Sequence, residues 1–132
     1  MSKDSYEEGQ KIRRKMLGDA WCDRSSATEN DFNREIRRKV ISQAWGDVWT
    51  RPGIDPKTRR FMTMSMMIAL RAWDEFRLHV RTGLMQGDLT KDELKEIIMQ
   101  ATAYCGAPAG NHATHVAEEA FKEMANEGAK PR

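Results

Sequence analysis

The sequence predicts an all-α fold of about six helices packed into one compact domain. Apolar residues recur at three- and four-residue spacing along most of the chain, residues that cap or break helices separate these stretches, and patterns typical of strands are nearly absent. A chain of 132 residues is long enough for one domain with its own core and too short for two domains of ordinary size. We therefore expect residues 1–132 to form a single helical bundle.

The composition argues against several classes of function. The 22 Lys and Arg residues and the 20 Asp and Glu residues leave a net charge of only +2, and both signs are interleaved, so nothing favours a nucleic-acid partner. No apolar run approaches the roughly 18 residues of a membrane span, and the first residues lack the apolar core of a signal peptide. We therefore expect a cytoplasmic protein that binds neither nucleic acid nor membrane, with Cys22 and Cys105 as reduced thiols.

The first helix is predicted between Ser5 and Gly18. Ser5 is followed three residues later by Glu8, which makes a possible capping box for the free backbone N–H groups at a helix start. Glycine lacks the side chain that hinders the backbone conformation in which helices often end. Residues 19–27 are then expected to form a linker.

A second helix is predicted to follow, with Thr28 and Asp31 as its capping residues. Its apolar residues have the spacing of one inward face, made of Phe32, Ile36, Val40, Ile41 and Ala44. This helix leads into a stretch of unusual composition, Ala44–Gly53.

A third helix is predicted from Asp55 and Pro56, with the aspartate as cap and the proline as first helical residue. Residues 61–70 are apolar on almost every side of this helix, which is typical of a helix that is buried all round. In so small a domain, a partner subunit could supply part of the cover.

The next segment, residues 73–85, ends near Gly87. It carries one apolar stripe, formed by Trp73, Phe76, Val80 and Leu84. The sequence leaves open whether this segment continues the third helix or breaks from it near Arg71.

Two more helices complete the predicted bundle. Thr90 and Glu93 form a clear capping box, which predicts a helix over residues 91–104. A Cys-Gly-Ala-Pro sequence breaks it, and a last helix is predicted over residues 108–126, with proline in its first turn. The remaining residues, 127–132, are expected to be a polar, frayed tail.

The stretch Ala44–Gly53 gathers two indoles, Trp45 and Trp49, with the guanidinium of Arg51 and a frame of glycine and proline. A guanidinium matches a carboxylate bidentately, and indoles offer flat apolar surface. The stretch therefore suits a cradle for a small flat anion. The alternative is a helix end held by a core tryptophan, and spacing alone favours neither.

Glu75 and His79 are four residues apart, so they share one helix face and could form a hydrogen bond. His79 falls at the border of the apolar stripe, where it would be half dry and reachable. A histidine there can act as a general acid, because a neighbouring carboxylate raises its pKa toward neutrality. The alternative is a structural histidine paired with an adjacent glutamate.

His112 and His115 could be imagined with His79 as three ligands of a metal. The sequence places no further carboxylate or thiol with them. We therefore expect no metal.

Several motifs together resemble one family. They are Tyr6-Glu7-Glu8-Gly9 with Arg13-Arg14, Leu17-Gly18-Asp19-Ala20, the stretch Ala44–Gly53, Glu75 with Leu78-His79-Val80-Arg81, and Tyr104-Cys105-Gly106-Ala107-Pro108-Ala109. The chain resembles, over nearly its whole length, the carboxymuconolactone decarboxylase family and its 4-carboxymuconolactone decarboxylases in particular. The Glu75/His79 spacing belongs to the wider superfamily that includes alkylhydroperoxidase D.

The resemblance implies an all-α fold of that superfamily type and a homo-oligomer, expected to be a hexamer. It also implies an enzyme that converts a small lactone, 4-carboxymuconolactone, to the β-ketoadipate enol-lactone and CO2 in protocatechuate catabolism, without a cofactor. In this interpretation His79 and Glu75 are catalytic, Arg51 clamps a substrate carboxylate, and Trp45 and Trp49 wall the ring.

Three other functions remain open. A related decarboxylase or lactone-processing enzyme could use the same pocket for another small carboxylated substrate, since His112 and Gln100 depart from the expected pattern. A thiol peroxidase is less favoured, because Ala72 and Glu75 stand where the peroxidase relatives carry a Cys-x-x-Cys pair. The third alternative is a non-catalytic helical oligomer that acts as a scaffold.

Overall fold

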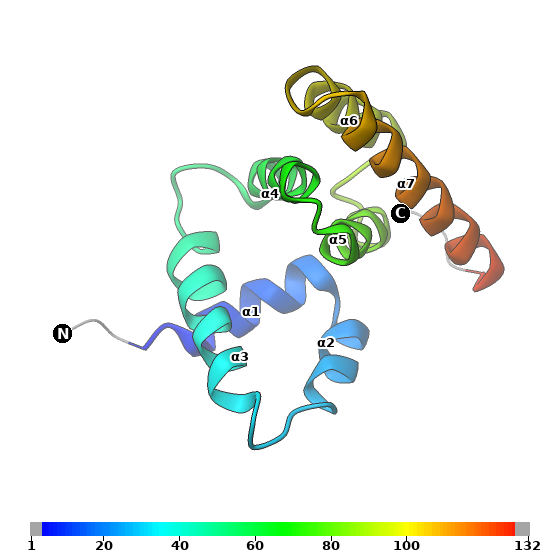
Figure 1. Ribbon diagram of the computed structural model, residues 1–132. Coiled ribbons are helices and arrows are strands. Elements are labelled where there is room, and N and C mark those ends of the chain that lie inside the picture. Colours follow the sequence, from blue (N-terminus) through cyan, green and yellow to red (C-terminus); the bar gives the residue numbers. More distant parts are fainter. Residues whose placement is uncertain (1–3, 129–132) are drawn as a thin grey trace. The chain divides into compact units, whose positions relative to one another are not determined.

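The computed structural model describes residues 4–128, and every regular element in that range is a helix. The all-α prediction is confirmed, with seven α-helices in the described residues rather than about six, and with one additional π-helix, η1. None of these helices is both long enough and apolar enough to cross a membrane. The elements, shown in Figure 1, are α1 (Tyr6–Leu17), α2 (Asp19–Ser26), α3 (Arg34–Val40), η1 (Ile41–Trp49), α4 (Pro56–Leu70), α5 (Trp73–Gln86), α6 (Lys91–Cys105) and α7 (Ala107–Asn126).

The chain divides into two compact units, Met1–Pro56 and Lys57–Arg132. The N-terminal unit holds α1, α2, α3 and η1, and the C-terminal unit holds α4 to α7. Each unit is described by itself below. The single domain over residues 1–132 stays a prediction, and of the predicted tail, residues 129–132 lie outside the described range.

Helix α1 has the predicted ends, but the predicted capping box is wrong. No side-chain bond caps α1, because the hydroxyl of Ser5 lies 2.9 Å from the carbonyl oxygen of Ser42 and also contacts the carboxylate of Asp47. At the other end Gly18 has φ 85°, a conformation that favours glycine, and its N–H donates to Arg14. Ser5 therefore joins α1 to η1 instead of closing the helix start.

The predicted linker over residues 19–27 is wrong, since these residues form α2. The positive φ of Gly18 turns the chain within one residue, so α2 starts directly after α1. Arg14 then bonds Asp19 at 2.9 Å and Asp23 at 2.7 Å, and Asp19 lies at the positive end of the helix dipole.

The second predicted helix begins later than expected and ends later as well. The side-chain oxygen of Asn30 accepts from the N–H of Asn33, and that of Asn33 accepts from the N–H of Asn30, both at 2.9 Å. This closed turn delays α3 to Arg34. From Val40 the helix continues as the π-helix η1, so much of the stretch Ala44–Gly53 is helical.

The inward face predicted for this helix is also wrong in part. Phe32, Ile36 and Val40 are 84%, 55% and 52% exposed, whereas Ile41 is buried. The described residues of α3 include none that is buried, so its apolar side chains lie on the surface of this chain.

Gly9 and Gly46 mark the place where α1 and η1 cross. A Cβ atom on Gly9 would overlap the carbonyl oxygen of Ile41, and one on Gly46 would overlap the carbonyl oxygen of Ser5. Only glycine lets the two backbones approach this closely. The crossing therefore fixes how η1 lies against α1.

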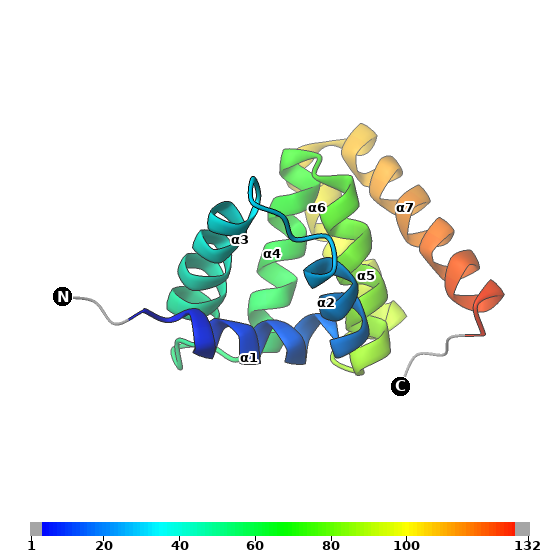
Figure 2. The ribbon, with the colours of Figure 1, turned by 90° about the horizontal axis from the view of Figure 1, so that it is seen from below.

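In the C-terminal unit, α4 and α5 lie side by side, as both ribbon views show (Figures 1 and 2). They are separate helices, because the backbone of Arg71 between them has a φ of 57°. The sequence had left open whether the chain breaks there. Thr90 and Glu93 form the predicted capping box at the start of α6, with bonds of 3.1 and 3.0 Å. Arg77 and Arg81 join α5 to α7 through ion pairs with Glu119 and Glu123 of α7, and Arg81 also pairs with Glu127 just after that helix.

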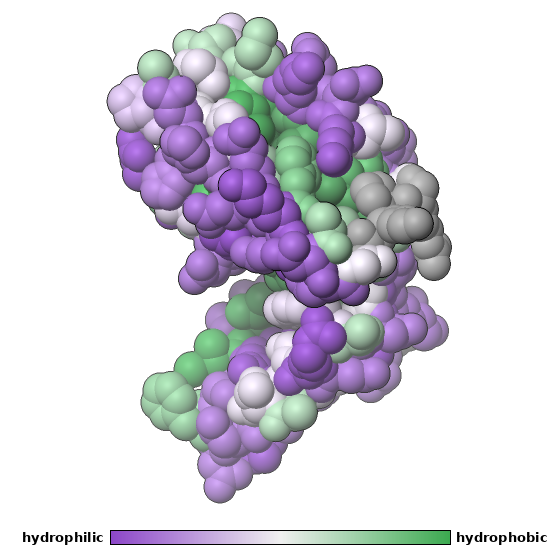
Figure 3. Space-filling model, turned by 90° about the vertical axis from the view of Figure 1, so that its right-hand side faces the viewer, coloured by the Kyte–Doolittle hydropathy of each residue, from purple (hydrophilic) through white to green (hydrophobic). Residues whose placement is uncertain are grey.

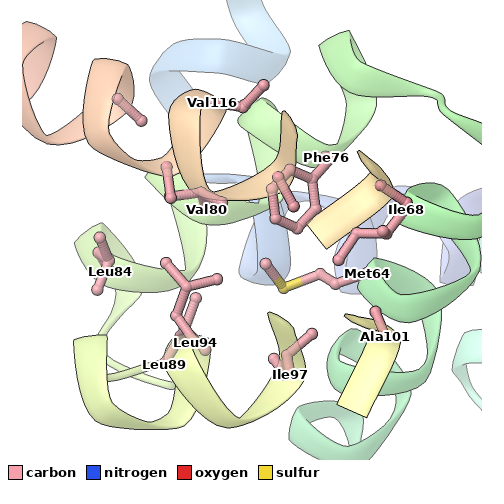
Figure 4. Packing of buried hydrophobic residues seen from close by; sticks show 14 of the residues in the cluster. Met64, Ile68, Phe76, Val80, Leu84, Leu89, Leu94, Ile97, Ala101 and Val116 are labelled. Atoms are coloured by element: carbon pink, nitrogen blue, oxygen red, sulfur yellow. The ribbon is translucent and has the colours of Figure 1, made fainter. Parts of the chain in front are cut away.

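One apolar core fills the C-terminal unit (Figure 4). Met64 lies between Phe76 and Ile97 in that view, and all three are buried. The sequence predicted that this helix is buried all round. That prediction is wrong for α4, because one stripe of the helix is exposed. That stripe is Met62, Met66 and Leu70, at 46%, 57% and 79% exposure.

The substitution Gly46→Ala should lower the free energy of unfolding by about 1–3 kcal/mol, because the added methyl group forces α1 and η1 apart. The measurement is urea-induced unfolding at matched protein concentration. Gly53→Ala is the control, since its Cβ would meet nothing within 4 Å. Equal unfolding midpoints for the two variants would contradict the close crossing.

Candidate active site

His79 lies in the interior of the C-terminal unit and is 3% exposed. Its Nδ1 atom is 3.0 Å from a terminal nitrogen of Arg60 on α4. The sequence predicted a half-exposed position at the border of the core. The position is buried instead because a polar partner from another helix reaches the imidazole there.

Arg60 itself is fully buried, at 0% exposure, and it contacts several polar groups. Its Nε lies 3.2 Å from the carboxylate of Asp88, and the terminal nitrogen that contacts His79 also donates to Thr82 at 3.1 Å. The Thr82 hydroxyl donates in turn to the carbonyl oxygen of Leu78 at 2.7 Å. A buried cation is thereby held by one anion and two neutral acceptors.

The environment shifts the titration of both members of the pair. Burial, and then the positive charge of Arg60, lower the pKa of His79 to about 3. Burial also lowers the pKa of Arg60, while Asp88 acts in the opposite direction. At neutral pH the imidazole is therefore uncharged.

Glu75 lies one turn before His79 on α5 and is exposed. The expected influence of this carboxylate on the histidine is wrong, because the pKa of His79 is lowered and burial and Arg60 are its causes. Within residues 4–128 the structure places no bond between the two side chains. Glu75 and His79 lie on the same side of α5, but the Nδ1 atom of His79 contacts Arg60 of α4 instead.

In the N-terminal unit, Trp45 and Trp49 lie together on η1. Their rings stack with centroids 4.5 Å apart and an angle of 25° between the planes, and each residue is 8% exposed. A substrate ring therefore does not insert between them. Arg51 follows in the short connection to α4 and is exposed.

The remaining histidines and cysteines are dispersed. The ring of His112 stacks on Trp73 at 4.2 Å, and His115 lies on the exposed face of α7, 4.0 Å from Glu118. Across the described range, no three potential metal ligands gather into one group. Burial raises the pKa of the Cys22 thiol, which makes it a poor thiolate, and Cys105 is exposed.

Sequence reasoning missed three residues of the buried network, namely Arg60, Thr82 and Asp88. One signal could have found Arg60. It lies four residues before Met64 and eight before Ile68, so it belongs to the face of α4 that is buried.

The comparisons with known proteins identify a family. The family model described as carboxymuconolactone decarboxylase matches residues 35–119, which include η1, Arg60 and His79. The chain belongs to the carboxymuconolactone decarboxylase family. The matched range takes in the stacked tryptophans of the N-terminal unit and the buried network of the C-terminal unit.

Two curated relatives are similar to this chain over most of its length. A protein of Acinetobacter baylyi named 4-carboxymuconolactone decarboxylase is 42% identical over 119 residues, which cover 90% of this chain and 88% of that protein. The nitrosuccinic acid decarboxylase npaB of Metarhizium robertsii is 32% identical over 93% of this chain and 85% of its own length. Both carry names of decarboxylases, so an enzymatic carbon–carbon cleavage is the activity that the relatives share.

The buried imidazole should leave a signature in the pH dependence of stability. Its pKa is about 3 in the folded chain and about 6.5 in an unfolded one. Between these values the unfolded chain binds more protons, so stabilisation by neutral His79 is complete above pH 6.5 and is lost as the pH falls toward 3.

Between pH 6 and pH 4, the wild-type chain should lose about 1 kcal/mol of unfolding free energy per pH unit more than His79→Asn does. Asparagine does not titrate, and its amide oxygen can accept a hydrogen bond from Arg60. Urea unfolding at several pH values measures the difference. If the unfolding free energy of both proteins changes equally with pH, the pKa of His79 does not change on folding.

Proposed function

We propose that this chain removes CO2 from 4-carboxymuconolactone to give the β-ketoadipate enol-lactone, a step of protocatechuate catabolism. The observation that carries the proposal is the 42% identity to a protein of that name over 90% of the chain. The buried, uncharged His79 beside a fixed cation supports it, since it offers a preorganised polar group in an apolar interior. The cytoplasmic location expected from the sequence stays a prediction.

In this reaction the protein has to position the substrate and stabilise the charge that develops on it. The bond between the ring carbon and the leaving carboxylate breaks, and its electron pair moves through the ring to the lactone oxygen. The resulting dienolate then takes up a proton at the ring α-carbon. Since the lactone accepts the electron pair itself, the protein has to orient the carboxylate, stabilise the oxyanion and allow the protonation.

His79 is proposed to stabilise the charge that develops on the lactone oxygen. A buried N–H donor is worth more in an apolar interior than in water. Protonated histidine is excluded from this role at neutral pH, because the pKa of His79 is lowered to about 3.

Glu75 is proposed as the second catalytic group, in a role that differs from the one suggested by its spacing. Because the Nδ1 of His79 is bonded to Arg60, Glu75 does not hold the imidazole. A carboxyl group one turn away on the same helix can instead pass a proton between water and the ring carbon.

Arg51, Trp45 and Trp49 are proposed to bind the substrate. The guanidinium of Arg51 can grip a carboxylate bidentately, and it stands in a connection rather than inside a helix. The indoles stack on each other and leave no open slot between them, so they would bound the ring on one side.

A homo-oligomer, with a hexamer as the proposed size, accounts for the exposed apolar side chains. One set is Phe32, Ile36 and Val40, and another is the α4 stripe of Met62, Met66 and Leu70. Figure 3 shows apolar surface among hydrophilic surface on one face of the chain. Large apolar side chains that are exposed in groups are typical of subunit contacts.

A second candidate is decarboxylation of another small carboxylated substrate. The observation that favours it is the 32% identity to a nitrosuccinic acid decarboxylase over 93% of the chain. Both candidates share carboxylate loss driven by an adjacent electron sink.

Purified protein should consume 4-carboxymuconolactone generated in the cuvette, followed by loss of its ultraviolet absorbance and by CO2 release. His79→Ala should lower kcat roughly 100-fold with little change in KM, because it removes a group that acts in the transition state. Nitrosuccinate tested in parallel separates the two candidates. Full turnover by folded His79→Ala would remove histidine from the mechanism.

Arg51→Ala should raise KM about tenfold or more while kcat changes little, because the lost guanidinium binds a carboxylate that is present before and during the reaction. Steady-state kinetics with the lactone measure both constants. Arg24→Ala, at an exposed arginine of α2, is the matched control and should behave like wild type. A KM equal to that of the control would show that Arg51 does not contact the substrate.

A further inference from the structure

The contact between Arg60 and His79 determines where the imidazole proton sits. A guanidinium has five N–H donors and no acceptor. The Nδ1 atom of His79, 3.0 Å from a terminal nitrogen of Arg60, must therefore be the acceptor of that bond. In a neutral imidazole the single proton is then on Nε2.

The same contact opposes a second proton on the ring. Protonation of Nδ1 would point an N–H group at the N–H of Arg60 and place two cations side by side in the interior. Among the described residues of the C-terminal unit, the charged groups around the imidazole include Arg60 from α4, Glu75 on its own helix, which is exposed, and Asp88 after α5, whose carboxylate lies 3.2 Å from the Nε of Arg60. No carboxylate among them is bonded to Nδ1 to compensate an imidazolium.

Arg60 is held rigidly enough to impose this state. The Thr82 hydroxyl donates its hydrogen to Leu78, so it can only accept from Arg60. Gly83 leaves room for the arginine stem, because a Cβ there would lie 3.2 Å from Cδ of Arg60 and 2.9 Å from the side chain of Leu89. The planar guanidinium thus has its donors aimed by Asp88 on one edge and by Thr82 and His79 on another.

We propose that Arg60 is the positioning residue of the site and that it keeps His79 in the neutral Nε2–H form, so that the imidazole serves as a hydrogen-bond donor to the lactone oxygen. The catalytic half of this inference rests on the proposed function. Neutral imidazole is a known way for an enzyme to polarise a carbonyl group.

The assignment divides the reaction between groups. The donor Nε2–H stabilises the oxyanion and keeps its proton, so the proton that reaches the ring α-carbon comes from water, directly or through a carboxyl group such as Glu75. One carbon–carbon bond breaks, one carbon–hydrogen bond forms, and no redox partner is needed.

The test is ¹⁵N NMR of protein labelled at histidine, which reports both the tautomer and the charge of His79. In wild type, His79 should show a proton on Nε2 and no titration between pH 5 and pH 8. Arg60→Met should produce a mixture of tautomers or a titration inside that range, with kcat lowered roughly 100-fold and KM little changed. Arg81→Met is the matched control, since it removes an α5 arginine that pairs with Glu123 of α7 and with Glu127 just after α7, and it should retain the wild-type spectrum and kcat.

Arg60→Lys keeps the charge but lacks the planar fork, so it should restore the uncharged state of His79 and only part of kcat. This variant also covers the case in which Arg60→Met does not fold. The inference would be overturned if His79 in the wild type carries its proton on Nδ1 or titrates near pH 6.5. It would also be overturned if Arg60→Lys or Arg60→Met has both a spectrum and a kcat identical to wild type. Failure of every variant and of wild type to turn over the lactone, with the expected spectra, would instead overturn the proposed function and leave the tautomer assigned.

Discussion

The C-terminal unit depends on one buried cation. Removing a guanidinium from water costs several kcal/mol unless partners offset it, so the surroundings of Arg60 have to satisfy it. Those partners include His79 and Thr82 on α5 and Asp88 just after that helix. The ion therefore ties one end of α4 to α5, while Met64 and Ile68 carry the same face of α4 into the apolar core.

Local sequence signals predicted the helix ends correctly where residues within one turn determine the end of the helix. Gly18 ends α1, Pro56 starts α4, and the Thr90–Glu93 box starts α6. Ser5 shows the limit of such signals, because its hydroxyl contacts residues 37 and 42 positions away instead of capping its own helix. The spacing of apolar residues along α3 correctly indicated an apolar helix face. Spacing does not show whether that face packs against this chain or against another one.

The candidate site was predictable in part for the same reason. The helical period placed His79 near the core, and the only carboxylate within four residues of it in sequence is Glu75. The actual partner lies 19 residues earlier on another helix, and no periodicity couples the two. A polar residue is drawn from the border into the interior when a neighbouring helix satisfies it, and that pairing emerges only once the helices are packed.

The glycine crossing of α1 and η1 has a consequence for the tryptophans. No side chain separates the two backbones at Gly9 and Gly46, so η1 has little freedom to roll against α1. Trp45 precedes Gly46 directly, and Trp49 follows within one turn. The orientation of both indoles is thus set by the segment from Ser5 to Gly9, and a change of the chain near Ser5 would alter the indoles without contacting them.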